Sequence, residues 1–390
     1  MTLRLLLILG ALTAFGPLAI DLYLPAFPAL AQAFGTDVEH VQLSLATYFV
    51  GLALGQLAYG PVIDRFGRRG PLLFGIVLFC IASLGCALAT SLEQLMVARF
   101  VQAVGGCVGM VASRTVVRDL CDPLTTAKVF SQLMLVMGLA PILAPAIGAL
   151  LLEQAGWMSI FVLLSLFSAV CGVAVYRWLP ETYPAGLARV PLGRALPQYL
   201  RLLRDRTFMG HTFAGGFAMA GMFAYIAGSP FVFIDLYGVA PSHYGWLFGA
   251  NAAGFILMAQ VNARLIRLHG PQYWLLRWSA LHGLAGLVLL GVALAHPAAL
   301  VWLLPPLFGS IATLGGMVPN ATACALAGQG ENAGSASALL GSVQFGIAAL
   351  ASAAVGALHD GSAVPMAGVM AASAVVSLLC TLATGRGRPG

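Results

Sequence analysis

Twelve apolar segments, each long enough to cross a lipid bilayer, follow one another along this chain of 390 residues. A membrane-spanning helix needs about 20 mostly apolar residues, because the hydrocarbon core is about 30 Å thick. Hydrophobic residues make up 60% of the chain and charged residues only 8%, whereas a soluble domain carries about 25% charged residues. We therefore predict an all-α membrane protein with spans at approximately 3–25, 42–62, 71–90, 95–117, 126–150, 157–178, 208–230, 243–266, 272–294, 298–324, 332–353 and 363–384.

The first residues, MTLRLLLILGALTAFG, have the single arginine and the apolar core of a secretory signal. Against that interpretation, the apolar run continues to Phe27, and no clean A-x-A cleavage site follows it. We predict that this segment is the first span and is not removed.

Basic residues divide the predicted loops into two sets. With the N-terminus placed inside the cell, the cytoplasmic loops hold arginines such as Arg65, Arg68 and Arg201. The outer loops hold no Lys or Arg, and their acidic residues are Asp37, Glu39, Glu93, Glu153, Asp235 and Asp360. Cytoplasmic loops of membrane proteins collect Lys and Arg. We therefore predict that both termini lie in the cytoplasm, and we attribute the net charge of +6 to this rule rather than to a nucleic-acid partner.

The longest polar stretch, residues 179–208, is rich in arginine and separates six predicted spans from six others. We therefore predict an N-terminal bundle at 1–180, a cytoplasmic linker at 181–206 and a C-terminal bundle at 207–390. Within the linker, YLRLLRDR could form a short amphipathic helix on the membrane surface, or it could be a basic tether near anionic lipid headgroups. Two similar halves are typical of transporters whose substrate site lies between them.

A short motif lies in the loop between the second and third spans. Residues 60–69, GPVIDRFGRR, resemble the G-x-x-x-D-R-x-G-R-R/K signature of the major facilitator superfamily, which implies two six-helix halves in a pseudo-twofold arrangement. Glycines permit a tight turn and close helix approach, whereas basic anchors alone would need neither the glycines nor the aspartate. We therefore predict a cytoplasmic gate that includes Gly60, Asp64, Arg65, Gly67 and Arg68.

The carboxylate of Asp64 needs a partner at this gate. It could pair with a nearby arginine, or it could face the positive N-terminal end of the span at 332–353, near Gly334; either contact would latch the two halves together. Asp119, at the inner end of the fourth span, is expected close to Asp64 and Arg68, where the three could form a charge relay. The alternative for Asp119 is a solvated helix end.

Arg99 is the one arginine that this topology places far from the cytoplasm. Its segment RFVQAVGG resembles the R-x-x-Q-G-x-G pattern of the same superfamily, except that Ala103 stands where a glycine is expected. An arginine inside the membrane costs several kcal/mol unless it is paired. Arg99 could snorkel to the outer headgroups; we favour a side chain that faces the cavity and stabilises a carboxylate or helps it lose its proton.

Small residues and prolines recur on one face of the span at 126–150. Their spacing resembles, in a loose form, the G-x-x-x-G-P-x-x-G-G pattern associated with antiporters. Small residues would let this span pack closely against the span at 243–266, and prolines permit bending. Generic packing of small residues explains the pattern nearly as well. The residues concerned are Gly138, Pro141, Pro145 and Gly148.

One carboxylate, Asp21, lies in an otherwise apolar run, GPLAIDLYLPAFP, in the outer half of the first span. Ionised and unpaired there, it would cost a few kcal/mol or more, so it must face a cavity, pair with a cation or hold a proton. Such a group can exchange a proton for a cationic substrate. The alternative is a residue wetted by water at the outer mouth, because Pro25 and Pro28 follow closely.

Together, AIDLYLPAFP, GPVIDRFGRRGPLL, VRDL, LAPILAP and LPET closely resemble the Bcr/CflA family of the major facilitator superfamily, over essentially the whole chain. That family holds proton-coupled drug antiporters, including exporters of the bicyclomycin and chloramphenicol type. The resemblance implies that Asp21 serves proton or substrate coupling and that Arg99 is its partner. It does not fix the substrate.

Other residues within the predicted spans are candidates for the substrate cavity. Polar groups inside spans usually face the interior of the bundle, and aromatic and methionine side chains suit an apolar pocket that accepts many ligands. Each of them is equally a candidate for helix packing. The residues are Tyr23, Tyr48, Gln56, Met222, Tyr225, Asn251 and Gln344.

These features predict a transporter in which an inward proton, carried at least partly by Asp21, drives hydrophobic drug-like molecules outward by alternating access. No catalytic triad, phosphate-binding loop or metal motif occurs in the sequence, so we expect no enzyme, cofactor or metal ion, and a functional monomer surrounded by lipid. The alternatives are a carrier of the same fold for a sugar, amino acid or nucleoside, and a membrane scaffold or enzyme without transport.

Overall fold

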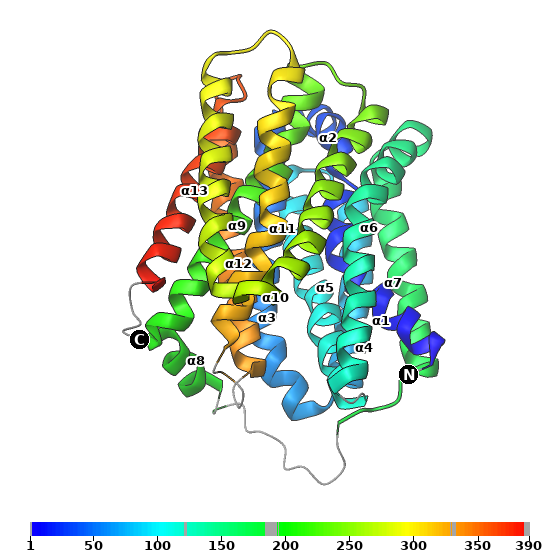
Figure 1. Cartoon of the computed structure of the whole chain (residues 1–390). Coiled ribbons are helices and arrows are strands. Elements are labelled where there is room, and N and C mark those ends of the chain that lie inside the picture. Colours follow the sequence, from blue (N-terminus) through cyan, green and yellow to red (C-terminus); the bar gives the residue numbers. More distant parts are fainter. Residues whose placement is uncertain are drawn as a thin grey trace.

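The protein is a bundle of helices that run roughly along one axis (Figure 1). α1 begins and α13 ends at the same end of the molecule, which we call the termini end; the other is the far end. The computed structural model describes residues 2–120, 123–183, 193, 195–327, 329 and 333–385, without the side chains of residues 118, 333 and 385 and of most residues in 123–141.

Helices make up both halves of the described chain. The first half contains α1 (Leu3–Asp21), α2 (Phe27–Phe34), α3 (Val38–Phe66), α4 (Arg69–Ala87), α5 (Leu92–Leu120), α6 (Pro123–Ala155) and α7 (Met158–Trp178). The linker contains α8 (Ala195–Arg204). The second half contains α9 (Arg206–Pro230), α10 (Pro241–Leu294), α11 (Leu304–Leu326), α12 (Ala333–Ala357) and α13 (Val364–Gly385).

Ten helical segments of the described residues are long and apolar enough to cross a membrane. One of them, α10, consists of two helices that meet at Gly270, whose φ of 74° and ψ of 169° are not helical. Glycine adopts positive φ without steric cost, and Pro271 follows it directly. With α6, which is described only in part, the spans number twelve, and the predicted fold class is confirmed.

The first span, predicted at 3–25, is broken close to the two prolines that follow Asp21 in the sequence. α1 ends at Asp21, a single helical turn, η1, covers Leu24–Ala26, and α2 begins at Phe27. Pro25 and Pro28 cause the break, because proline has no N–H to donate and disfavours the helical conformation of the residue before it. Asp21 therefore lies at a helix end inside the span.

The linker contains the short amphipathic helix that YLRLLRDR predicts. Its Leu202 is buried in a small apolar cluster with Phe208 of α9 and Leu339 of α12, while Arg201 and Arg204 are exposed. α8 therefore rests with its apolar side on the second half of the protein, at the termini end (Figure 1).

The two halves meet along α3 with α12 and along α6 with α10. At the second contact, a Cβ added to Gly245 would lie 3.0 Å from the backbone nitrogen of Ala146, and one added to Gly249 would lie 3.3 Å from the Ile142 side chain. The predicted close packing of 126–150 against 243–266 is present. Within the predicted motif, Pro145 is buried, and Gly138 and Pro141 lie outside the described side chains.

Gly148, the last residue of that motif, faces the first span. An added Cβ there would overlap the carbonyl oxygen of Leu22, at the break after Asp21. We predict that Gly148→Ala lowers the free energy of unfolding by about 1–3 kcal/mol, because neither backbone can move aside freely. Thermal unfolding in detergent measures this as a lower Tm.

The matched control for this substitution is Gly291→Ala in α10, where an added Cβ meets nothing within 4 Å. Alanine favours a helix over glycine by about 1 kcal/mol, so the Tm of this variant should be unchanged or slightly raised. An equal fall in Tm for both variants would contradict the proposed contact between Gly148 and Leu22.

Candidate functional site

Asp21 lies at the break in the first span, enclosed by protein. The residue is 3% exposed, and among the described residues it makes no hydrogen bond or ion pair. α6 closes the space behind it, because Gly148 allows α6 to approach Leu22. The alternative environment, an outer mouth wetted by bulk water, is not what this conformation shows. Asp21 is instead a buried carboxyl that has no cationic partner among the described residues.

Across from Asp21 lies a polar network of the second half. The turn η1 contacts α9 and α10, and Asp21 is close enough to Tyr225 and Tyr244 to interact with both electrostatically. The Asn251 amide donates a hydrogen bond to the Tyr225 hydroxyl at 3.0 Å, and the hydroxyls of Ser229 and Tyr244 are 2.8 Å apart. Tyr225 and Asn251 were candidates from the sequence; Ser229 and Tyr244 were missed.

Arg99 of α5 lies in an aromatic box. It is fully buried, and its guanidinium carbon is 4.3 Å from the ring centre of Tyr23 and 4.1 Å from that of Tyr48. One guanidinium nitrogen, Nη1, donates to the Gln102 side-chain oxygen at 2.6 Å, while Nε and Nη2 have no partner among the described residues. Cation–π contacts contribute about 2 kcal/mol or more when desolvated, so the rings stabilise this buried charge without a carboxylate.

The predicted pairing of Asp21 with Arg99 is not formed in this structure. The break after Asp21 turns Tyr23 toward α5, where its ring covers Arg99 and its hydroxyl lies 2.9 Å from the Ser44 hydroxyl. Tyr23 and Tyr48, both expected in the cavity, are fully buried and serve this box instead. Sequence spacing gives no signal for such a box, because its members come from three separate segments, the break after α1, α3 and α5.

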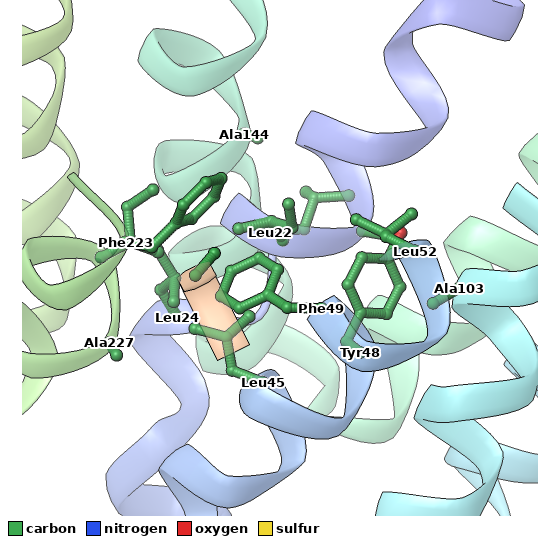
Figure 2. Packing of buried hydrophobic residues seen from close by; sticks show 14 of the residues in the cluster. Leu22, Leu24, Leu45, Tyr48, Phe49, Leu52, Ala103, Ala144, Phe223 and Ala227 are labelled. Carbon is green, nitrogen blue, oxygen red and sulfur yellow. The ribbon is translucent and has the colours of Figure 1, made fainter. Parts of the chain in front are cut away.

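Aromatic and apolar side chains fill the middle of the interface between the halves (Figure 2). Phe49 of α3 meets Phe223 of α9 with ring centres 4.4 Å apart, and Phe345 of α12 lies 5.7 Å from Phe223. This layer joins one helix of the first half to two of the second. It was not predicted from the sequence, since phenylalanines are frequent throughout the spans.

The remaining cavity candidates lie at helix contacts near this layer. Gln56 of α3 is buried, and its side-chain oxygen would overlap a Cβ added to Gly341 of α12. Gln344 of α12 lies beside Gly215 of α9, and Met222 packs partly buried against the core. Their positions between helices fit the packing alternative in this conformation.

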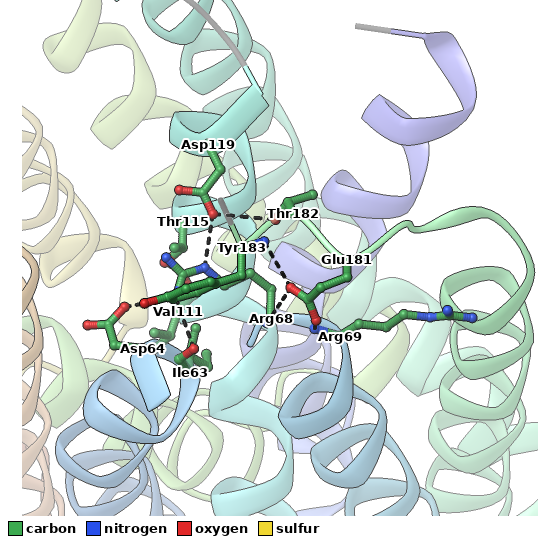
Figure 3. Close-up of polar contacts among 10 residues, drawn as sticks. All are labelled: Ile63, Asp64, Arg68, Arg69, Val111, Thr115, Asp119, Glu181, Thr182 and Tyr183. Carbon is green, nitrogen blue, oxygen red and sulfur yellow. Dashed lines mark hydrogen bonds and ion pairs between the residues drawn. The ribbon is translucent and has the colours of Figure 1, made fainter. Parts of the chain in front are cut away.

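At the termini end, the predicted gate residues come together around Arg68 (Figure 3). The Arg68 guanidinium donates to Asp64 at 2.8 Å and to Asp119 at 2.9 Å, and it is almost fully buried. All three residues belong to the first half, so these ion pairs hold α3, α4 and α5 together. The expectation that the Asp64–Arg68 contact latches the two halves is therefore wrong.

Two further residues of the predicted gate, Arg65 and Gly60, lie outside the Arg68 cluster. Arg65 is exposed and lies 5.6 Å from the ring centre of Phe66. Gly60 lies at a contact between the halves, where an added Cβ would be 3.6 Å from the Ala338 side chain of α12.

Glu181 is a gate residue that the sequence analysis missed. Its carboxylate accepts hydrogen bonds from the backbone N–H groups of Arg68 at 2.8 Å, Arg69 at 3.1 Å and Tyr183 at 3.0 Å (Figure 3). It thereby caps the start of α4, where N–H groups lack helical partners and a negative charge is favoured. Glu181 belongs to the LPET segment that the sequence analysis quoted. That segment alone does not indicate that the Glu181 carboxylate binds the distant loop at Arg68 and Arg69.

Gly67 completes this contact. Its φ is 90°, in the region that favours glycine, and a Cβ there would lie 2.7 Å from a Glu181 carboxylate oxygen. Partial burial alone would raise the pKa of the Glu181 carboxyl, but the hydrogen bonds from Arg68, Tyr183 and Arg69 outweigh it and lower the pKa below its usual range.

The far end holds a polar contact that does join the halves. The imidazole of His359, just after α12, lies 2.9 Å from the carboxylate of Glu39 at the start of α3. The His359 ring also packs edge-on against Phe231, with ring centres 4.5 Å apart. Phe231 and His359 both belong to the second half, so the ring contact positions the imidazole, and the Glu39–His359 contact is the one of the two that joins the halves.

Two helical halves that enclose a buried polar site between them define a secondary transporter. Residues 9–353 match the Major Facilitator Superfamily. Among solved structures, the xylose transporter XylE from E. coli, in a partially occluded inward-open conformation, matches 99% of this chain and 97% of its own with a TM-score of 0.76. The two sequences are 12% identical, so that likeness concerns the fold alone.

Two bacterial relatives match nearly the whole chain. An uncharacterized MFS-type transporter, YdgK, of Bacillus subtilis is 38% identical over 100% of this chain and 97% of its own. A bicyclomycin resistance protein homolog of Haemophilus influenzae is 32% identical over 97% of this chain and 95% of its own. The chain belongs to the Bcr/CflA family of the Major Facilitator Superfamily, whose members are transporters and not enzymes.

The cap on α4 leads to a prediction with a defined pH dependence. Glu181→Gln should lower the Tm at neutral pH, because an amide cannot accept hydrogen bonds at both of its terminal atoms. Since the pKa of Glu181 is lowered in the folded protein, its stabilising contribution is complete above about pH 4.3 and is lost as the pH falls through the folded value.

Thermal unfolding of both proteins between pH 7 and pH 4 measures this contribution. The difference in Tm between the wild type and Glu181→Gln should stay constant down to about pH 4.3 and should become smaller only below that pH. Glu153→Gln, at an exposed position of α6, is the control and should leave the Tm unchanged. A Tm difference that widens toward low pH would contradict the assigned role of Glu181.

Proposed function

We propose that this transporter exports hydrophobic drug-like molecules in exchange for protons, by alternating access. The bundles at 1–180 and 207–390 are the two moving bodies, and 181–206 connects them. The observation that carries the proposal is the environment of Asp21, a carboxyl 3% exposed between the halves with no cation partner among the described residues. The family supports a transporter with drug-resistance relatives.

Asp21 exchanges its proton because its two environments differ. In the enclosed site an ionised carboxylate would cost several kcal/mol, whereas the protonated form carries no charge. When the halves separate so that the cavity opens to one side of the membrane, water or a cationic substrate reaches the carboxyl. The free-energy cost of ionising Asp21 then falls. Because the proton leaves only where the cavity is open, its movement is coupled to the movement of the halves.

Arg99 supplies a fixed positive charge in the same half as Asp21. Its aromatic box and Gln102 hold it in place, with two guanidinium nitrogens free of partners in the described structure. In the proposal this charge favours the ionised form of Asp21 once the cavity opens, so Arg99 promotes release of the proton. A rearrangement of Tyr23, two residues after Asp21, links the two groups.

The lining of the interface favours apolar cargo. The layer of Phe49, Phe223 and Phe345 and the stacked pair Tyr225 and Phe248, with ring centres 5.3 Å apart, offer aromatic faces from both halves. Such surfaces bind hydrophobic, planar molecules with little demand for fixed hydrogen bonds. The name of the bicyclomycin resistance relative supports a drug as the cargo.

The proposed setting is the bacterial inner membrane, with the termini end in the cytoplasm, as the arginines of the loops at that end predict. The Arg68 ion pairs then brace the cytoplasmic end of the first half so that it moves as one body. The proton gradient supplies the energy, lipid surrounds the bundle, and the monomer is the transporting unit.

We predict that Asp21→Asn abolishes exchange while the protein still folds, because asparagine has a similar shape and holds no exchangeable charge. In everted vesicles with an imposed pH gradient, adding a transported drug should dissipate the gradient in the wild type. Ionising a carboxylate in the enclosed site costs several kcal/mol, and each 1.4 kcal/mol corresponds to a tenfold change. We therefore expect the initial rate of gradient dissipation to be at least about tenfold lower in the variant.

Asp37→Asn, at an exposed position before α3, is the matched control and should transport normally. Full drug-dependent dissipation by Asp21→Asn would overturn the role of Asp21. Dissipation with a sugar, amino acid or nucleoside, but with none of the drugs, would favour a metabolite carrier of the same fold.

A further inference from the structure

The linker helix α8 places one tyrosine against a defect in the α3 helix. Tyr199 donates a hydrogen bond from its hydroxyl to the backbone carbonyl of Leu57, at 3.2 Å. In a regular helix that carbonyl would accept from the N–H four residues later. Residue 61 is a proline, which has no N–H and whose ring crowds the same carbonyl. The side chain of Tyr199 therefore supplies the hydrogen bond that Pro61 removes.

This hydrogen bond crosses from one half of the protein to the other. α8 rests on the second half through Leu202, which is buried against Phe208 and Leu339. Leu57 belongs to α3 of the first half, and the Tyr199 hydroxyl would lie 3.4 Å from a Cβ added to Gly60 on the same helix. The linker helix is thus docked on one half and bonded by its tyrosine to the other.

The hydroxyl of Tyr199 remains a donor at every physiological pH. Burial, with a smaller effect from the nearby Asp64, raises its pKa to about 12. The Leu57 carbonyl lacks the donor that a regular helix would supply four residues later, since Pro61 has no N–H. The contact is therefore conditional only on the relative position of α3 and α8, and hence on the relative position of the two halves.

We propose that Tyr199 is a positioning residue for alternating access: its bond to the Leu57 carbonyl tethers the kinked end of α3 to the second half and favours the conformation seen here. This rests on the alternating access proposed above, but not on proton exchange at Asp21. A net contribution of about 1 kcal/mol for one hydrogen bond corresponds to about a fivefold change in the conformational equilibrium.

Tyr199→Phe removes only the hydroxyl and tests this proposal. Spin labels at Trp178 of α7 and Leu382 of α13, both exposed at the termini end, report the distance between the halves in a cysteine-free background in liposomes. We expect the population of the present conformation, relative to the alternative, to fall about fivefold. Tyr273→Phe, at an exposed position of α10, is the control for removal of a tyrosine hydroxyl and should leave the distance distribution unchanged.

Pro61→Ala provides a second, independent test. Alanine restores the N–H that bonds the Leu57 carbonyl within the helix, so the Tyr199 hydroxyl must compete with that N–H for the same oxygen. The variant should reproduce the shift of Tyr199→Phe, and adding Tyr199→Phe to it should cause no further change. A distance distribution unaffected by Tyr199→Phe, or equal additive shifts in the double variant, would overturn the proposal.

The same measurement separates this proposal from the function proposed above. The distances are recorded without drug and at one pH, so they do not depend on coupling. Loss of exchange in Asp21→Asn with no shift in Tyr199→Phe would reject the tether alone. A shift in Tyr199→Phe with normal exchange in Asp21→Asn would reject the coupling role alone.

Discussion

Lipid offers no hydrogen bonds, and this constraint governs every polar group in the bundle. Backbone groups in the hydrocarbon must be paired within their own helix or covered by protein. The break at Leu22–Tyr23 obeys this rule because α6 and the second half cover it, with Gly148 giving the close approach. The defect at Pro61 obeys it as well, because Tyr199 pairs with the carbonyl that proline leaves open. Irregular backbone thus occurs where another element can reach it.

The same constraint separates structural charges from the candidate functional one. Arg68 is neutralised by two carboxylates, and Arg99 is stabilised by two aromatic rings and an amide. Each therefore has partners of its own. Asp21 is equally enclosed but has no described partner of opposite charge. Among these three buried charged residues, Asp21 alone lacks both an oppositely charged partner and an aromatic box in the described structure, which is why the proposed function places the proton there.

Hydropathy and loop charges predict the fold well, because a bilayer imposes a fixed length on each span regardless of its neighbours. The Arg68 cluster was also predictable, since Asp64 and Arg68 are four residues apart and a family motif marks them. The aromatic box, the Glu181 cap and the Tyr199 bond were not, because each depends on one contact between segments far apart in sequence. Even the break at Asp21, signalled by Pro25 and Pro28, gave no indication that Tyr23 would cover Arg99.

The contacts between the halves differ in kind from one end of the described bundle to the other. At the far end a single carboxylate meets an imidazole, in the middle aromatic rings pack without directional bonds, and at the termini end one hydroxyl meets one carbonyl. Within each half, by contrast, polar groups form clusters, as around Arg68 and Glu181. The hydrogen bonds of a cluster must break together. An isolated contact can break alone, at a free-energy cost of about 1 kcal/mol. This contrast fits the proposed alternating access, in which the halves stay rigid and the interface between them rearranges between two conformations of similar free energy.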